Sequence, residues 1–183
     1  GPLCGFFLSV SVFQIGLQRK LSVLSRKDGL TGLNNRRSFF ELTERRRARK
    51  SKGVLLMLDA DLFKEINDCH GHQAGDIALK SIAHMLRRNL REQDTIGRLG
   101  GEEFAVYMHD MTIEQARAVA RRLVKPVAFR TASGVHLTVT LSIGAAISQT
   151  ENTLDEMINR ADKALYLAKD TGRGKLVVWD EIP

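Results

Sequence analysis

Residues 95–108 read TIGRLGGEEFAVYM, with a strand-like run on each side of a glycine pair. Glycine adopts turn conformations that other residues resist, so this stretch predicts a β-hairpin. The tip of the hairpin carries two adjacent carboxylates, Glu102 and Glu103, and hard divalent cations prefer such oxygen ligands. From the spacing alone, a solvated acidic turn and a cation site fit equally well.

A second acidic segment ends a predicted buried strand. Residues 54–61 read VLLMLDAD, an apolar run of strand length that ends in Asp59 and Asp61. If this strand neighbours the hairpin, Asp59 meets the two glutamates at one edge of a sheet and forms a site for Mg²⁺ or Mn²⁺, with positions left for phosphate oxygens. For Asp61 we favour a different role, as the N-cap of the helix that follows.

The periodicity of the apolar residues indicates an α+β fold with a central, mostly antiparallel sheet flanked by helices. We expect the helices to cover one face of this sheet. The predicted long helices lie near residues 36–50, 73–91, 112–124 and 153–169, and the predicted strands near 54–59, 95–99, 103–108, 137–148 and 175–179.

Composition limits the classes of protein that this chain represents. Its 183 residues, 43% of them hydrophobic, suffice for one domain with a substantial core. The net charge of +7 is compatible with nucleic-acid binding, but the basic residues are spread along the chain, and a solvated surface explains them better. We therefore expect no nucleic-acid partner.

The cysteines argue against both a disulfide framework and a zinc site. Cys4 and Cys69 are far apart in the sequence, which fits a reducing cytoplasm. Cys69, His70 and His72 lie close together, but no fourth ligand follows at a recognisable zinc spacing.

Three separate segments together resemble one known family. They are DGLTGLNNRR at 28–37, DADLFKEINDCHGHQAGD at 59–76 and GGEEF at 100–104. In order and spacing they closely resemble the GGDEF family of diguanylate cyclases, in the GGEEF form of the signature, over about residues 25–180. The resemblance implies a fold similar to nucleotide cyclase and polymerase palm domains. It also implies that two GTP molecules are condensed into cyclic di-GMP, with release of two pyrophosphates, by a homodimer whose two sites face each other.

The resemblance also implies which groups hold the metal. Asp59, the carbonyl of Ala60, Glu102 and Glu103 match the positions that bind Mg²⁺ or Mn²⁺ in the family. Glu102 and Glu103 are then the catalytic acids, and Glu102 is the position credited with helping to deprotonate the attacking hydroxyl.

Guanine and phosphate ligands follow from the same match. Asn67 and Asp76 correspond to the guanine-binding pair, and adenine would leave these groups unpaired at a cost of about 1–3 kcal/mol each. The backbone N–H groups at Phe63 and Lys64 begin a short helix, whose dipole favours phosphate. The remaining expected substrate ligands are Lys169, Arg173 and His72, although a local hydrogen bond in the Gly71 turn explains His72 equally well.

Regulation is implied by an RxxD motif before the hairpin. Arg91 and Asp94 match the site at which cyclic di-GMP inhibits members of the family. Outside that context they would form an exposed i,i+3 ion pair of little energetic weight. Arg122, or its neighbour Arg121, is expected to complete the inhibitory site from a second molecule.

The N-terminal segment differs in character from the rest of the chain. Residues 3–17 are almost uncharged and are followed by Arg19 and Lys20. This run is shorter than the ~20 residues that span a bilayer, and it resembles the cytoplasmic end of a membrane helix. We expect residues 1–26 to be a truncated transmembrane or juxtamembrane helix and signalling linker, and 27–183 to be the GGDEF catalytic domain. An amphipathic helix that dimerises or packs on its own domain is the alternative.

These expectations describe a cytoplasmic catalytic domain in a protein that is anchored in the inner membrane and controlled by an upstream sensor. Two rival functions remain. A catalytically silent module that senses GTP or cyclic di-GMP is disfavoured because Asp59, Asn67, Asp76, Glu102 and Lys169 are all present. A palm-type polymerase is disfavoured because 183 residues leave little room to hold a template.

Overall fold

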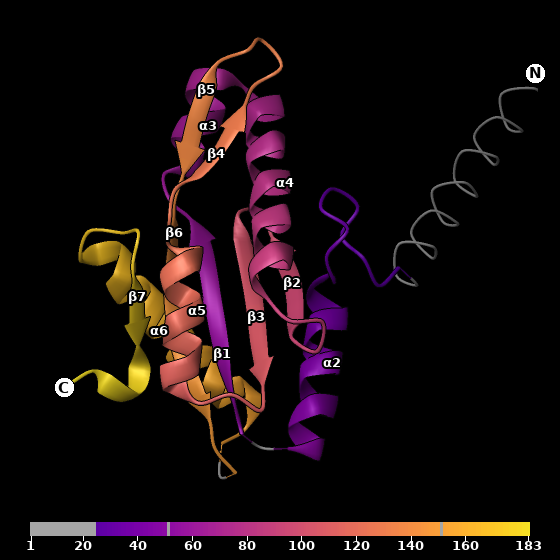
Figure 1. Cartoon of the computed structure of the whole chain (residues 1–183), viewed down its shortest axis with the longest axis vertical. Helices are drawn as coiled ribbons and strands as arrows, with labels where there is room; N and C mark the ends of the chain where they lie inside the picture. The colour runs from indigo at the N-terminus through magenta and orange to yellow at the C-terminus, as the bar shows by residue number, and fades with distance from the viewer. Residues whose placement is uncertain (1–24, 51, 151) are drawn as a thin grey trace, which may run out of the picture.

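The computed structural model describes residues 25–50, 52–150 and 152–183. Its strands are β1 (Gly53–Ala60), β2 (Thr95–Gly100), β3 (Glu103–His109), β4 (Val127–Arg130), β5 (His136–Val139), β6 (Leu141–Ser148) and β7 (Leu176–Val178). Five of them form a sheet in the order β2-β3-β1-β6-β7, and β4 and β5 form a separate two-stranded sheet (Figure 1). Neighbouring strands of the large sheet are antiparallel except β6 and β7. The predicted α+β class with a mostly antiparallel sheet is confirmed.

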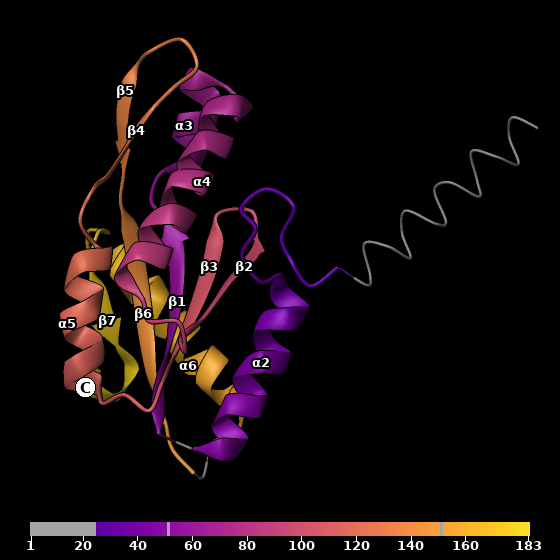
Figure 2. The same cartoon turned by 45° about the vertical axis from the view of Figure 1, so that its right-hand side comes forward.

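Helices cover both faces of the large sheet (Figures 1 and 2). They are α2 (Arg36–Arg49), α3 (Phe63–His70), α4 (His72–Asn89), α5 (Ile113–Leu123) and α6 (Leu154–Asp170), followed by a short 3₁₀ turn, η1 (Trp179–Glu181). On one face, Leu56 and Leu58 of β1 share a core cluster with apolar residues of α4 and α5. On the other face, Leu55 and Met57 join Phe39 of α2 and residues of α6.

The expectation that helices cover one face only is therefore wrong. The reason lies in β1, which is buried at all eight positions. Successive side chains of a strand point to opposite faces, so a strand that is apolar throughout needs cover on both.

The four long helices lie within a few residues of their predicted ranges, but one predicted strand is divided. Residues 137–148 contain the end of β5 and all of β6, with a break at Thr140. β5 leaves the large sheet to pair with β4, whose four residues were not predicted as a strand. The resulting ribbon extends beyond the large sheet beside α3 and α4 (Figure 1).

The expected membrane-derived helix lies outside the described residues, because these begin at residue 25. The domain boundary at residues 26 and 27 therefore stays a prediction. Within the described ranges, no helix has both the length and the apolar character needed to cross a bilayer.

Gly144 of β6 provides a test of how closely the sheet packs on α6. A Cβ at this position would lie 2.1 Å from the carbonyl oxygen of Ala161 and 2.2 Å from the nitrogen of Leu165. Both atoms belong to the backbone of α6, so the helix has to move. We expect Gly144→Ala to lower the free energy of unfolding by about 3 kcal/mol, measured by urea denaturation. Gly29→Ala is the control, because nothing lies within 4 Å of its added Cβ. Equal stability of the two variants would contradict this packing.

Candidate active site

The register of β1 and β3 brings the predicted metal ligands to one edge of the sheet. Asp59 pairs directly with Glu103 across the two strands. The Ala60 N–H donates to the carbonyl of Glu102 at 3.1 Å, which fastens the end of β1 to the hairpin. Gly100 and Gly101 turn the chain with φ of 146° and 50°, values that favour glycine. The strand end and the hairpin tip therefore present Asp59, Glu102 and Glu103 together.

The three carboxylates concentrate negative charge at this edge of the sheet, and one ammonium group lies close to them. The Nζ of Lys169, on α6, lies 2.9 Å from Oδ2 of Asp59. Burial raises the pKa of the Asp59 carboxyl above its ordinary value, the ion pair with Lys169 lowers it in part, and the charges of Glu102 and Glu103 raise it further. A divalent cation would relieve this repulsion.

The donors at this edge fit Mg²⁺ or Mn²⁺, which bind through one or two carboxylates and keep positions for water and phosphate. Among the described residues, no three His, Cys, Asp or Glu side chains are placed so that they could hold a metal ion by themselves. A cation here therefore needs further oxygen ligands, and the Ala60 carbonyl and the phosphates of a nucleotide are the natural sources.

The two predicted guanine ligands lie where α3 is followed by α4. Oδ1 of Asn67 is buried and finds no hydrogen-bond donor among the described residues. Buried acceptors are rarely left unpaired, so Asn67 has hydrogen-bonding capacity that the described residues do not use. Gly75 makes the room, because a Cβ there would lie 2.0 Å from Asn67 Oδ1 and 3.0 Å from the Phe63 ring. Asp76, the second predicted guanine ligand, is the next residue on α4 and is exposed.

The predicted phosphate ligands lie in three parts of the chain: α3, the start of α4 and the turn after α6. α3 begins at Phe63, so the N–H groups of Phe63 and Lys64 are free of intrahelical bonds. The Lys64 ammonium itself pairs with Asp68 on the exposed side of α3, at 3.2 Å. Arg173 lies in the turn after α6, the helix that carries Lys169. His72 begins α4 with an exposed side chain.

Asp61 is not the helix cap that its position suggests. Leu62 occupies the N-cap position of α3 and makes no side-chain capping bond. The carboxylate of Asp61 instead accepts hydrogen bonds from the hydroxyls of Thr140 and Ser142 and from the N–H of Gly174. The N-cap prediction is therefore wrong, because these donors lie at Thr140 before β6, on β6 itself and in the turn after α6, and they attract the carboxylate away from α3.

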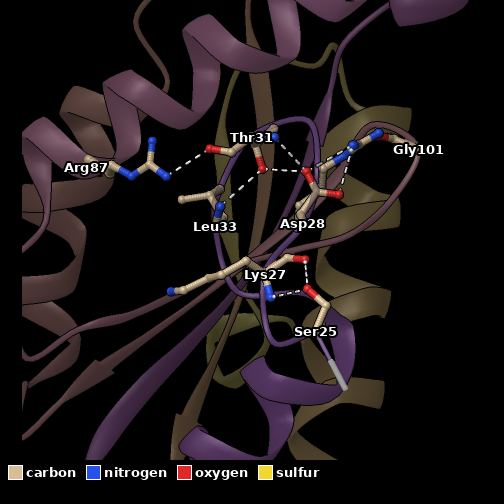
Figure 3. Close-up of polar contacts among 8 residues, drawn as sticks. Ser25, Lys27, Asp28, Thr31, Leu33, Arg87 and Gly101 are labelled. Atoms are coloured by element: carbon tan, nitrogen blue, oxygen red, sulfur yellow. Dashed lines mark hydrogen bonds and ion pairs between the residues drawn. The ribbon is translucent and has the colours of Figure 1, made fainter. Parts of the chain in front are cut away.

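An ion pair that the sequence analysis does not predict supports the hairpin. The Asp28 carboxylate lies 3.1 Å from the guanidinium of Arg98, whose Nε donates to the Gly101 carbonyl at 2.9 Å. Figure 3 shows Asp28 at the centre of the turn before α2, where it also accepts from the N–H and hydroxyl of Thr31 at 2.8 and 2.7 Å. The turn before α2 is thus fastened to the glycine turn that presents the glutamates. No local pattern indicates a contact between residues 70 positions apart.

The RxxD residues form an ion pair in the turn between α4 and β2. Asp94, with a side chain only 1% exposed, lies 2.8 Å from the Arg91 guanidinium. It also accepts from the N–H of Arg91, and Arg91 donates to the His109 carbonyl. The hydrogen bond that the Arg91 guanidinium donates to Asp94 raises the pKa of Arg91. This pair is more buried than a surface i,i+3 ion pair. Arg122 bonds to Asn89 of its own chain, at 3.2 Å, near the start of this turn.

Comparisons with known proteins give a consistent result. The family model described as "Diguanylate cyclase, GGDEF domain" matches residues 25–175. The probable diguanylate cyclase DgcT of Escherichia coli K12 is 39% identical over 167 residues, which cover 87% of this chain and 37% of DgcT. The chain therefore spans well under half the length of this relative.

Solved structures agree with the sequence comparison. Diguanylate cyclase SiaD of Pseudomonas aeruginosa, in complex with its activator SiaC, is 37% identical with a TM-score of 0.76, and the match covers 94% of this chain and 70% of SiaD. The GGDEF domain of DgcB from Caulobacter crescentus, in complex with c-di-GMP, is 28% identical with a TM-score of 0.80, and the match covers 86% of this chain and 97% of that domain.

The Asp28 ion pair predicts a pH-dependent contribution to stability. Burial raises the pKa of Asp28, but the hydrogen bonds from Thr31 and the contact with Arg98 outweigh it, so the pKa lies below the ordinary value of 3.8. Such a group stabilises the fold above the unfolded-state pKa and loses that contribution as the pH falls through the folded-state value.

We expect Asp28→Asn to lower the free energy of unfolding by about 2 kcal/mol at pH 7, because Arg98 loses a charged partner. The difference from wild type should shrink as the pH falls below 3.8. Urea denaturation at several pH values measures it, with the exposed Asp68→Asn as control. A difference that stays constant with pH would show that the charge of Asp28 contributes nothing.

Proposed function

The chain belongs to the GGDEF domain family of diguanylate cyclases, and from this we propose that it condenses two GTP molecules into cyclic di-GMP and releases two pyrophosphates. The observation that carries the proposal is the pairing of Asp59 with Glu103 at the sheet edge, with Lys169 on Asp59. Phosphoryl transfer depends mainly on alignment and on neutralising charge. The arrangement of acids, ammonium and helix start supplies groups for both tasks.

The metal-side residues prepare the attacking hydroxyl. Asp59, the Ala60 carbonyl, Glu102 and Glu103 would hold Mg²⁺ or Mn²⁺, which neutralises phosphate charge and favours ionisation of a coordinated hydroxyl. Glu102 accepts the proton of the 3′-hydroxyl. Asp59 would bind the cation in its ionised form, which the charge of the cation favours.

The substrate-side residues select and orient GTP. Asp76 accepts from the donor edge of guanine. The amide of Asn67, whose Oδ1 has no partner among the described residues, can turn to serve either edge of the base. The N–H groups of Phe63 and Lys64 receive phosphate oxygens. The Lys169 ammonium moves from Asp59 to a phosphate oxygen. This movement is short, because the ammonium already lies 2.9 Å from Asp59, which would hold the cation. The two remaining ligands are Arg173 for the triphosphate and His72 for ribose or phosphate.

Two copies of the chain have to act together. Each site holds one GTP, and each 3′-hydroxyl attacks the α-phosphate of the other nucleotide, so two sites face each other in a homodimer. Residues 1–26 supply the juxtamembrane linker that brings the copies together in response to an upstream sensor, with the catalytic domain on the cytoplasmic side.

The RxxD residues bind the product and limit the reaction. Arg91 keeps a guanidinium face for stacking on guanine, while the buried Asp94 fixes its orientation. Arg122 contributes from the partner molecule. Complexes of a GGDEF domain with c-di-GMP are known for DgcB of Caulobacter crescentus, which supports binding of the same molecule here.

Gly75→Ala tests the guanine pocket. The added methyl displaces Asn67 Oδ1, which would lie only 2.0 Å away, while helix α4 gains a residue of better helix propensity. We expect affinity for a non-hydrolysable GTP analogue to fall about tenfold, with a smaller preference over the ATP analogue. Titration calorimetry measures both, with Gly29→Ala as control. Unchanged base preference would remove Asn67 from guanine recognition.

Product analysis tests the activity itself. Bound nucleotide is first removed from the protein. GTP and Mg²⁺ are then incubated with it over a range of protein concentrations, and the products are separated by chromatography. We expect cyclic di-GMP to rise more steeply than the protein concentration. Glu102→Gln should reduce the rate by at least about a hundredfold, while the exposed Glu114→Gln on α5 leaves it unchanged. Absence of product at every concentration, even after forced dimerisation, would overturn the activity in favour of a binding module.

A further inference from the structure

Asp61 connects three segments around the candidate active site through one buried carboxylate. It follows Asp59 by two residues and is only 7% exposed. Its Oδ2 accepts from the Thr140 hydroxyl at 2.7 Å and from the Gly174 N–H at 3.0 Å. Its Oδ1 accepts from the Ser142 hydroxyl at 2.6 Å. The carboxylate therefore joins the end of β1 to the start of β6 and to the turn after α6.

That turn requires external support because of its backbone conformation. Arg173 has a φ of 62°, between Gly172 at 119° and Gly174 at 56°. The left-handed region costs a residue with a side chain about 1–2 kcal/mol. Two main-chain N–H groups of the turn donate hydrogen bonds that hold it in place. The Arg173 N–H donates to the Ala168 carbonyl at 2.9 Å, and the next N–H, that of Gly174, donates to Asp61.

Asp61 differs from Asp59 in what its oxygens contact. Both oxygens of Asp61 already accept hydrogen bonds from fixed donors. The ionic partner of Asp59, in contrast, is the long side chain of Lys169, which can leave when a cation arrives. A cation that approached Asp61 would have to displace hydroxyl and N–H groups that the sheet and the turn hold in position.

We propose that Asp61 is a positioning residue that fixes Arg173 at the phosphate end of the nucleotide site and takes no part in holding the metal. It ties the turn of Arg173 to the same strand end that carries Asp59, across 113 positions of sequence. The backbone of the turn that carries Arg173 is thereby held at a fixed position relative to Asp59 before substrate arrives. This inference rests on the proposed function, because Arg173 needs a triphosphate to meet.

Two substitutions separate positioning from metal binding. Asp61→Ala removes the acceptor of all three donors. Asp61→Asn keeps an acceptor oxygen for Thr140 and Gly174, and the Ser142 hydroxyl can turn to accept from the new amide. An amide replaces a carboxylate well in a hydrogen-bonded role and poorly as a ligand of Mg²⁺.

The probe is a non-hydrolysable GTP analogue with Mg²⁺, titrated calorimetrically into the full chain. We expect Asp61→Ala to weaken binding about tenfold, the effect of one lost charged contact, and Asp61→Asn to stay within about threefold of wild type. In an Arg173→Ala background, Asp61→Ala should cause no further loss, because residues that act through one another are not additive. Affinity for Mn²⁺ alone should be equal in all variants.

Several results would overturn the inference. An equal loss from Asp61→Ala in both backgrounds would show that Asp61 does not act through Arg173. A loss of Mn²⁺ affinity in Asp61→Asn would make Asp61 a metal ligand. If Asp61→Ala does not fold, Asp61→Ser replaces it in the same cycle, since its hydroxyl is too short to reach Gly174. Wild-type protein that fails to bind the analogue would overturn the proposed function as well, whereas equal binding by wild type and Asp61→Ala would overturn this inference alone.

Discussion

The antiparallel register between β1 and β3 is the constraint on which the candidate site depends. It pairs Asp59 with Glu103 and leaves Glu102 at the hairpin tip. A slip of one residue would move every side chain of β1 to the opposite face. β1 is buried on both faces between two helical layers, so such a slip would require both closely packed cores to rearrange. The hydrophobic core thereby determines where the acidic residues meet.

Around this fixed edge, the more irregular parts of the site are held by individual polar contacts. Asp28 and Arg98 connect the turn before α2 to the hairpin. Asp61 connects the turn of Arg173 to the strand end. Lys169 is held by Asp59 itself, in a contact that a cation and a phosphate can replace. Rigid contacts thus support the framework, while the exchangeable contact lies where substrate would bind.

Much of this arrangement could be predicted from the sequence, because its signals are local. An apolar run ending in Asp59 and a glycine pair before Glu102 predicted that the acids would meet. The failures have a common physical origin. The partners of Asp61 lie 79, 81 and 113 positions away, so a capping rule that considers only neighbouring residues gave the wrong role. The apolar run of β1 identifies a strand, and only its lack of alternation indicates that both faces are buried and need a second helical layer.

The measurement that tests the account most directly is a crystal structure of the chain with Mn²⁺ and a non-hydrolysable GTP analogue, with the manganese located by its anomalous scattering. The account predicts manganese bound by Asp59, the Ala60 carbonyl and Glu102, with guanine against Asn67. Manganese away from these acids would contradict it. So would a nucleotide in the cavity of about 520 Å³ between α4 and β4, beside Lys80, His84 and Arg88.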